Sequence, residues 1–290
     1  ALINALLAGA NTGIVVTGVT LNGQRDDFNV GPPDDPSGAV GIVSSGTYTN
    51  ASGTYGIGPG VALSTGSVAP VTVFGETFLP GYGDGIDPEK EETTWVYGSE
   101  FPPEPVEPGS PPGGVPATAA QEALLDPITG GGVEDFEHFD VTELIIEFDM
   151  QPGVAQIAFN VVFGSEEFDR FVGDLFIDGF GMFLNGQNIA FVNGQPVNIN
   201  HPDMAFLGDT VLNGVLAPGG IPVLTFGGPV NPTGNELRFI VADTSDGALD
   251  TTVYFSALTG VPLPASAWLI LTAVGALAGR GVLRRKPAAA

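Results

Sequence analysis

Two runs of alternating side chains constrain the fold of this chain more than any other feature. In "TELIIEFDM" (142–150), Leu144, Ile146 and Phe148 alternate with acidic residues, and "QIAFNVVFG" (156–164) is apolar at every second position from its second residue. A period of two places the apolar side chains of an extended segment on one face. Each run therefore predicts a β-strand with one face turned toward a core.

Turn signals between further alternating runs indicate an antiparallel arrangement. "MFLNGQNIAFVNGQPVNI" (182–199) contains two Asn-Gly pairs six residues apart, a spacing typical of consecutive hairpins. "ELRFIVAD" (236–243) and "TTVYFSAL" (251–258) alternate again and are expected to close the sheet. We predict an all-β fold, an antiparallel, jelly-roll-like β-sandwich, over residues 1–260.

Helical patterns are expected only at the two ends. The apolar spacing of Leu2, Ile3, Leu6 and Leu7 favours a short amphipathic helix that opens the domain, and no long amphipathic helix is expected between Thr12 and Thr259. Seven prolines in residues 101–116 predict an extended, Pro-rich insertion or linker.

The charge balance bears on the partners of the chain. All 33 acidic residues and four of the eight basic residues precede Val261. Such a surface repels phosphate backbones, which disfavours nucleic-acid binding, and it attracts cations. High solubility in a salty exterior is the simpler interpretation of the same charge. Cysteine is absent, so disulfides and thiolate chemistry are excluded.

Acidic residues in predicted loops are the best candidates for a metal site. Ca²⁺ takes six to eight oxygen ligands from carboxylates and carbonyls, so loops that bring several acids together favour it. The candidate ligands are Glu166, Glu167, Asp178, Asp243 and Asp246, with a weaker second group at Asp84, Asp87 and Glu89. Asp178 is expected to be half-buried and to need a partner. In the alternative interpretation these acids are solvated loop residues and strand caps.

The end of the chain has the pattern of a membrane segment. Residues 261–279 carry no charge, and Arg284 and Arg285 follow within a basic cluster. Nineteen helical residues span about 28 Å, close to the ~30 Å of a bilayer core. We expect a C-terminal hydrophobic helix from about Ala265; a helix packed on the domain is the alternative.

This tail is similar to the VPLPA-type variant of the PEP-CTERM sorting signals. The resemblance rests on Val261, Pro262, Leu263, Pro264 and Ala265, followed by the apolar stretch and Arg284 and Arg285. It implies a Gram-negative secreted protein held transiently in the inner membrane until an exosortase-type enzyme processes it. Residues 261–290 are accordingly interpreted as a sorting and anchor segment.

A second resemblance covers much of the preceding chain. "VFGSEEFDRFVGDLFIDGFGMFLNG" (162–186), "FDVTELIIEFDM" (139–150), "VALSTGSV" (61–68) and "FIVADTSDGALDTTVYFSA" (239–257) resemble the choice-of-anchor L domain of bacterial surface proteins. The "GSEE" of that family is present, whereas Ile177 stands where an Asn is usual. The resemblance implies a cell-surface domain and brings no established enzymatic activity.

These observations predict a non-enzymatic, Ca²⁺-stabilised surface or extracellular-matrix protein that acts in adhesion or in matrix or biofilm structure. Neither of the two histidines, His138 and His201, is accompanied by a nucleophile-elbow serine. One alternative is a filament subunit that donates the strand at 15–21 to a neighbouring copy. The other is a polysaccharide-binding or -cleaving module that uses the aromatic residues of 95–101 beside Glu100. Self-association or exopolysaccharide would then be the partner.

Overall fold

The structure is a computed structural model, and it describes most of the chain between Leu2 and Pro262. The described residues are 2–7, 13–23, 28–29, 39–40, 44–48, 54–66, 68, 71–73, 76–78, 115–130, 136–207, 212, 214–245, 247, 249–256 and 258–262. Predictions for the Pro-rich segment before Val115, for Asp84, Asp87 and Glu89, and for the tail after Pro262 lie outside these residues.

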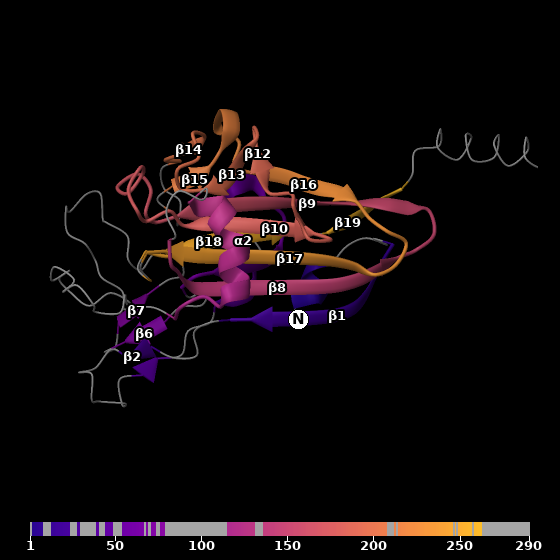
Figure 1. Cartoon of the computed structure of the whole chain (residues 1–290), viewed down its shortest axis with the longest axis horizontal. Helices are drawn as coiled ribbons and strands as arrows, with labels where there is room; N and C mark the ends of the chain where they lie inside the picture. Colours follow the sequence, from indigo (N-terminus) through magenta and orange to yellow (C-terminus); the bar gives the residue numbers. More distant parts are fainter. Residues whose placement is uncertain are drawn as a thin grey trace, which may run out of the picture.

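The first sheet is antiparallel, and β8 and β17 run through its middle (Figure 1). Its strands lie in the order β1 (Ile14–Asn22), β8 (His138–Met150), β17 (Asn235–Thr244), β10 (Gly179–Leu184), β13 (Gln195–Asn198) and β12 (Phe191–Val192), with β11 (Gln187–Asn188) beside β10. The period-two pattern of residues 142–150 thus produces the long strand β8.

The second sheet is also antiparallel and is organised around β9 (Val154–Ser165). Its strands lie in the order β14 (Met204–Ala205), β15 (Gly214–Leu216), β9, β18 (Thr251–Ser256), β5 (Gly60–Ser64) and β4 (Ser45–Tyr48), and β16 (Leu224–Pro229) and β19 (Thr259–Pro262) also pair with β9. Two small hairpins, β2 (Phe28–Asn29) with β3 (Ala39–Val40) and β6 (Val71–Val73) with β7 (Glu76–Phe78), and short 3₁₀ turns at Thr54–Gly56 and Pro218–Gly220 complete the described elements.

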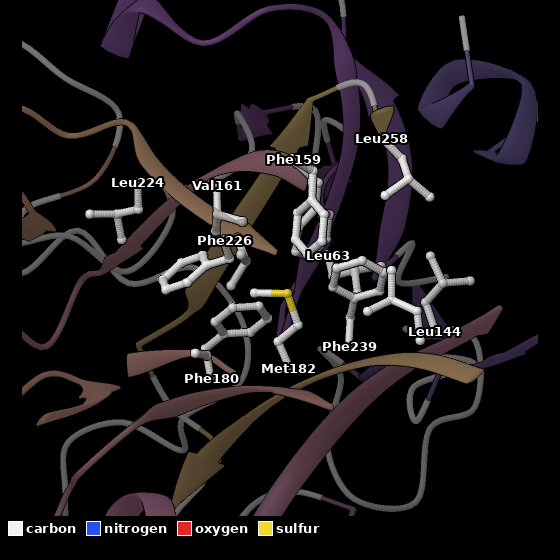
Figure 2. Packing of buried hydrophobic residues seen from close by; sticks show 14 of the residues in the cluster. Leu63, Leu144, Phe159, Val161, Phe180, Met182, Leu224, Phe226, Phe239 and Leu258 are labelled. Atoms are coloured by element: carbon white, nitrogen blue, oxygen red, sulfur yellow. The ribbon is translucent and has the colours of Figure 1, made fainter. Parts of the chain in front are cut away.

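The inner faces of the two sheets form one aromatic-rich core. Phe239 from the first sheet lies 5.6 Å, centroid to centroid, from Phe159 in the second sheet (Figure 2). The ring of Phe255, also in the second sheet, lies 4.4 Å from Phe239. Leu144 and Met182 pack into the same cluster. The apolar face predicted for each strand is therefore the buried face, and two packed antiparallel sheets are confirmed.

Two helices flank the sheets. α1 (Leu2–Leu6) packs on the core through Leu2, Ile3 and Leu6, as its apolar spacing predicted. The sequence analysis missed α2 (Ala119–Thr129), which lies across the outer face of the first sheet. A capping box starts α2: Thr118 accepts from the backbone of Gln121, and the Gln121 side chain accepts from the Thr118 backbone.

The hairpin predictions are confirmed, and one connection differs from the prediction. Both Asn-Gly pairs, Asn185-Gly186 and Asn193-Gly194, have positive φ at both residues, as a two-residue hairpin turn requires. The last two alternating runs do not close one sheet. β17 belongs to the first sheet and β18 to the second, so the turn between them crosses from one layer to the other.

The predicted tail begins inside the second sheet. Val261 and Pro262 belong to β19 and lie opposite Gln156 and Val154 of β9. Among the described residues, no helix combines the length and apolar character that a membrane span needs. The predicted C-terminal helix falls after Pro262 and stays a prediction.

We expect Phe239→Ala to destabilise the fold by about 3–5 kcal/mol, since it removes a ring packed against both sheets. The measurement is urea unfolding followed by circular dichroism. Phe206→Ala is the control, because Phe206 is 63 % exposed and its loss should change stability by about 0.5 kcal/mol or less. Equal effects of the two substitutions would contradict the assigned core.

Candidate metal site

An acidic cluster lies where strands of both sheets end. Asp140 is near the start of β8, Asp178 precedes β10, Asp243 is near the end of β17, and Asp250 precedes β18. Neighbouring antiparallel strands run in opposite directions, so the starts of some strands meet the ends of others at one rim of a sheet. We call these four residues the acidic cluster.

Asp178 is fully buried and is held by hydrogen bonds from both layers. The backbone N–H of Thr244 donates to its Oδ1 (3.1 Å), and the hydroxyl of Thr251 donates to its Oδ2 (2.6 Å). Thr244 belongs to the first sheet and Thr251 to the second. The prediction that Asp178 needs a partner is confirmed, although the residue is more deeply buried than expected.

Asp243 is buried beside the other three carboxylates of the acidic cluster. Burial raises the pKa of its carboxyl well above the ordinary value, the neighbouring carboxylates of Asp178, Asp140 and Asp250 raise this pKa further, and a hydrogen bond with Thr65 lowers it. Its Oδ1 is buried without a hydrogen-bond partner. A buried carboxylate oxygen in this position needs a proton or a cation.

Asp140, from β8 of the first sheet, and Asp250, which precedes β18 of the second sheet, complete the acidic cluster. Asp140 is buried with φ 49°, and its Oδ1 accepts a hydrogen bond from the backbone of Val115 (2.9 Å). The side chain of half-buried Asp250 occupies the space beside Gly66, where an added Cβ would lie 1.6 Å from Oδ2. The backbone C=O of Asp250 accepts from the N–H of Glu166 (3.2 Å). Any larger residue at position 66 would therefore displace the Asp250 carboxylate.

The acidic cluster offers the chemistry of a hard-cation site. Its members supply carboxylate oxygens, and hydroxyls of Thr65 and Thr251 adjoin them. The two arginines in the described part of the chain have other partners: Arg238 pairs with Glu143 and Glu236, and Arg170 lies over the ring of Phe171. Oxygen donors with this charge are the ligands that Ca²⁺ prefers.

The structure brings together two of the five metal ligands predicted from the sequence. It brings Asp178 and Asp243 together, while Asp246 lies outside the described residues. Glu166 and Glu167 are buried just after β9, but the carboxylate of Glu166 acts on Tyr254, whose pKa is raised by burial, by Tyr55 and by Glu166. Tyr254 contacts the rings of Tyr48 and Tyr55 outside the core cluster.

Asp140 was missed in the sequence because it stands in an alternating run. In "HFDVT" (138–142) it occupies a polar position of the alternation, where an acid is expected to face solvent. The hydroxyl donors Thr65 and Thr251 carry no recognisable sequence signal, since threonine is common in strands.

A second cluster of polar side chains surrounds the Glu143–Arg238 ion pair on the outer face of the first sheet, in which Nη1 of Arg238 lies 2.8 Å from Oε1 of Glu143. Asn22 donates to the other carboxylate oxygen of Glu143 (2.7 Å), so both oxygens have partners. The open hollow beside it is lined by Leu21, Asn22, Gly23, Thr118, Ala120, Gln121, Glu143, Ile145 and Arg238. This lining contains no aromatic ring on which a sugar could stack.

Comparison with known families identifies one segment. Residues 114–205 match the model of the Choice-of-anchor L domain. The matched part contains α2 and the strands from β8 to β14. Comparisons with curated proteins and with solved structures give no match.

The Choice-of-anchor L match includes Asp140 and Asp178 but ends before Asp243 and Asp250. The segments 61–68 and 239–257, to which the resemblance in the sequence was extended, lie outside the matched residues. They contribute to β5, β17 and β18 of the same two sheets. The matched segment therefore depends on later strands for both its core and half of the acidic cluster. The domain is typical of proteins associated with the cell surface.

We expect the metal-free protein to become more stable as pH falls from 8 toward 5. The raised pKa of Asp243 means that, between the ordinary carboxyl value of about 3.9 and the raised value, the folded state binds a proton that the unfolded state releases. Asp243→Asn should stabilise the metal-free protein at pH 8 by roughly 1–3 kcal/mol, and this gain should shrink as pH falls.

Urea unfolding at several pH values in the presence of a chelator measures this effect. Asp169→Asn removes the same charge at an exposed position and should follow the pH profile of the parent protein. A stability difference between Asp243→Asn and the parent that stays constant from pH 5 to pH 8 would disprove the role of Asp243.

Proposed function

We propose that the chain is a non-enzymatic, secreted cell-surface or extracellular-matrix protein whose sandwich is stabilised by Ca²⁺ in the acidic cluster. The Choice-of-anchor L segment supports the surface assignment. The buried Oδ1 of Asp243, which has no hydrogen-bond partner among three other carboxylates, is the single observation that carries the calcium assignment.

Calcium would stabilise the junction between the two sheets. The acidic cluster draws Asp140, Asp178 and Asp243 from the first sheet's strands and Asp250 from the segment that leads into the second sheet. Without a cation, ionised Asp243 opposes folding, because its charge is buried beside like charges. A bound ion reverses the sign of this interaction and ties the ends of both sheets together. Ion binding only to the folded state would then add directly to its stability.

The acidic cluster also suits an extracellular location. Millimolar calcium outside cells saturates sites of modest affinity, such as those of extracellular modules. In this proposal the net charge of −25 serves solubility, and a few buried acids do the structural work. Adhesion or matrix building would use the outer surface of the sandwich.

The C-terminal segment would serve as the sorting signal, with the inner membrane and an exosortase-type enzyme as transient partners. Val261 and Pro262 end the strand β19, and the predicted span starts at about Ala265. Two residues, Leu263 and Pro264, would then separate the sheet from the bilayer. The sandwich would stand directly on the membrane during sorting.

The two alternatives receive different support. β1 pairs with β8 along its length, from Ile14 opposite Met150 to Asn22 opposite Glu143. The strand-donor filament depended on residues 15–21 being unpaired within the chain, and this condition is not met. The aromatic residues of 95–101, which the polysaccharide alternative invoked, lie outside the described residues.

We expect the midpoint of thermal unfolding to rise as calcium passes its dissociation constant. At 100 times that constant the gain is about 2.7 kcal/mol, or about 5–10 °C for a domain of this size. The measurement is calorimetry of the purified chain, first with chelator and then with added CaCl₂. Asp243→Asn should abolish the gain, and Asp169→Asn should keep it. A midpoint that does not change up to 10 mM calcium would refute the calcium assignment and leave the surface assignment intact.

We expect the mature protein to lack the end of the chain when it is produced in a Gram-negative host with an exosortase-type enzyme. Intact-mass measurement should show loss of the residues that follow the "VPLPA" motif, and protease added to whole cells should degrade the sandwich. Replacing Arg284 and Arg285 by Gln should cause the unprocessed form to accumulate. A full-length mass from cells that carry the enzyme would count against sorting through this tail.

A further inference from the structure

We propose a second metal site, separate from the acidic cluster, that binds a divalent first-row transition ion such as Zn²⁺ through Glu122, Asp126 and His138. The geometry carries this proposal: one donor atom from each residue lies within 4.8 Å of the other two. Two carboxylates and one imidazole form a ligand set that suits Zn²⁺ and related ions.

Local structure explains why these three residues meet. Glu122 and Asp126 are four residues apart on α2, so their side chains lie on one face of the helix. His138 is the first residue of β8, over which α2 packs through Leu125 and Ile128. The chain leaves α2 and returns beneath it, which places the imidazole against the two acids. His138 is buried, whereas Glu122 and Asp126 are half-buried and leave a side open to water.

The imidazole is already oriented as in a metal-binding histidine. Its Nε2 lies 2.8 Å from the Thr129 hydroxyl, which itself donates to the backbone C=O of Leu125 (3.4 Å). Thr129 therefore accepts from Nε2–H, and Nδ1 faces the carboxylates. A ring nitrogen fixed by an outer partner, with the other nitrogen directed at the ion, is the usual arrangement of zinc-binding histidines.

The side chains of His138 and Glu122 contact each other at the point where the ion would bind. Nδ1 of His138 lies 2.5 Å from Oε2 of Glu122. Ligands on one zinc ion stand about 2.0–2.2 Å from the metal, so the half-exposed Glu122 carboxylate must withdraw slightly as the ion enters.

The charges on α2 favour a cation at this point. Carboxylates at positions i and i+4 repel each other. Asp126 also lies one turn from the C-terminal end of α2, where the helix dipole disfavours an acid, and the last turn of α2 contains no basic residue. A divalent ion offsets both effects and would fasten α2 to the first sheet.

Ion selectivity separates this site from the acidic cluster. Calcium prefers oxygen ligands, so it should bind the acidic cluster and leave the His138 site to Zn²⁺. The two sites share no ligand residue, so the zinc site can exist whether or not the calcium assignment holds.

The test is zinc titration of the full chain without a polyhistidine tag. Isothermal titration calorimetry should show about one ion bound per chain. The chain has two histidines, so nitrogen-detected NMR of the imidazoles reports on each. Zinc should shift the Nδ1 resonance of His138 and leave His201 unchanged.

Asp126→Asn should weaken zinc binding at least about 10-fold. In chelator it should not destabilise the chain, because Asn keeps the shape of Asp and removes a charge that Glu122 and the helix dipole disfavour. Asp203→Asn is the matched control, because Oδ2 of Asp203 lies 3.9 Å from Nδ1 of His201 in a second histidine–carboxylate pair. Its zinc affinity should equal that of the parent chain.

Three results would overturn the proposal: no heat on zinc addition, an unchanged His138 spectrum, or equal affinities of Asp126→Asn and Asp203→Asn. Glu122→Gln, which also removes one ligand, gives an independent check and should weaken binding like Asp126→Asn. Equal loss of zinc binding in Asp126→Asn, Glu122→Gln and the control Asp203→Asn would also contradict the proposal, because the effect would then not be specific to the His138 site.

Discussion

The contact between the inner faces of the two sheets determines the rest of this structure. Phe239 lies against Phe159 and Phe255 from the opposite layer, and all three rings are buried. Burial of rings of this size supplies several kcal/mol each. The connections from β8 to β9 and from β17 to β18 cross between the layers, so neither sheet can form its buried face without the other.

This same packing creates the acidic cluster. Chain crossings and strand ends meet at the rim of the two sheets. There the buried side chains between the layers include the carboxylates of Asp178 and Asp243. The stability that the core supplies offsets the cost of burying Asp243 beside other acids. In the proposed calcium site, Asp178 and its donors Thr244 and Thr251 are already fixed, so cation binding there would need little rearrangement.

α2 shows how a small element can extend the chemistry of a sandwich. It covers the outer face of the first sheet through Leu125 and Ile128, and its polar face brings Glu122 and Asp126 to His138. The proposed zinc site would stabilise the attachment of α2 to the first sheet, whereas the proposed calcium site would stabilise the junction of the two layers. The Choice-of-anchor L segment contains the first of these completely and only half of the second.

Local patterns in the sequence predict the long strands, their buried faces and the two Asn-Gly turns. Alternation in residues 142–150 and 156–164 and the Asn-Gly pairs are local signals, because a strand's pleat and a two-residue turn depend on neighbouring residues alone. The sequence also contained the "TAAQ" capping box of α2 (118–121), although its helical pattern is too short to stand out.

The packing of the two sheets determines which acids lie together. Asp140, Asp178, Asp243 and Asp250 are separated by up to 110 residues of chain and meet because antiparallel strands return to one rim. Glu166 and Glu167 follow β9 on the second sheet, where the N–H of Glu166 donates to the backbone C=O of Asp250 and its carboxylate acts on Tyr254. Burial and charge–charge distance are properties of the packed layers, and no local pattern encodes them.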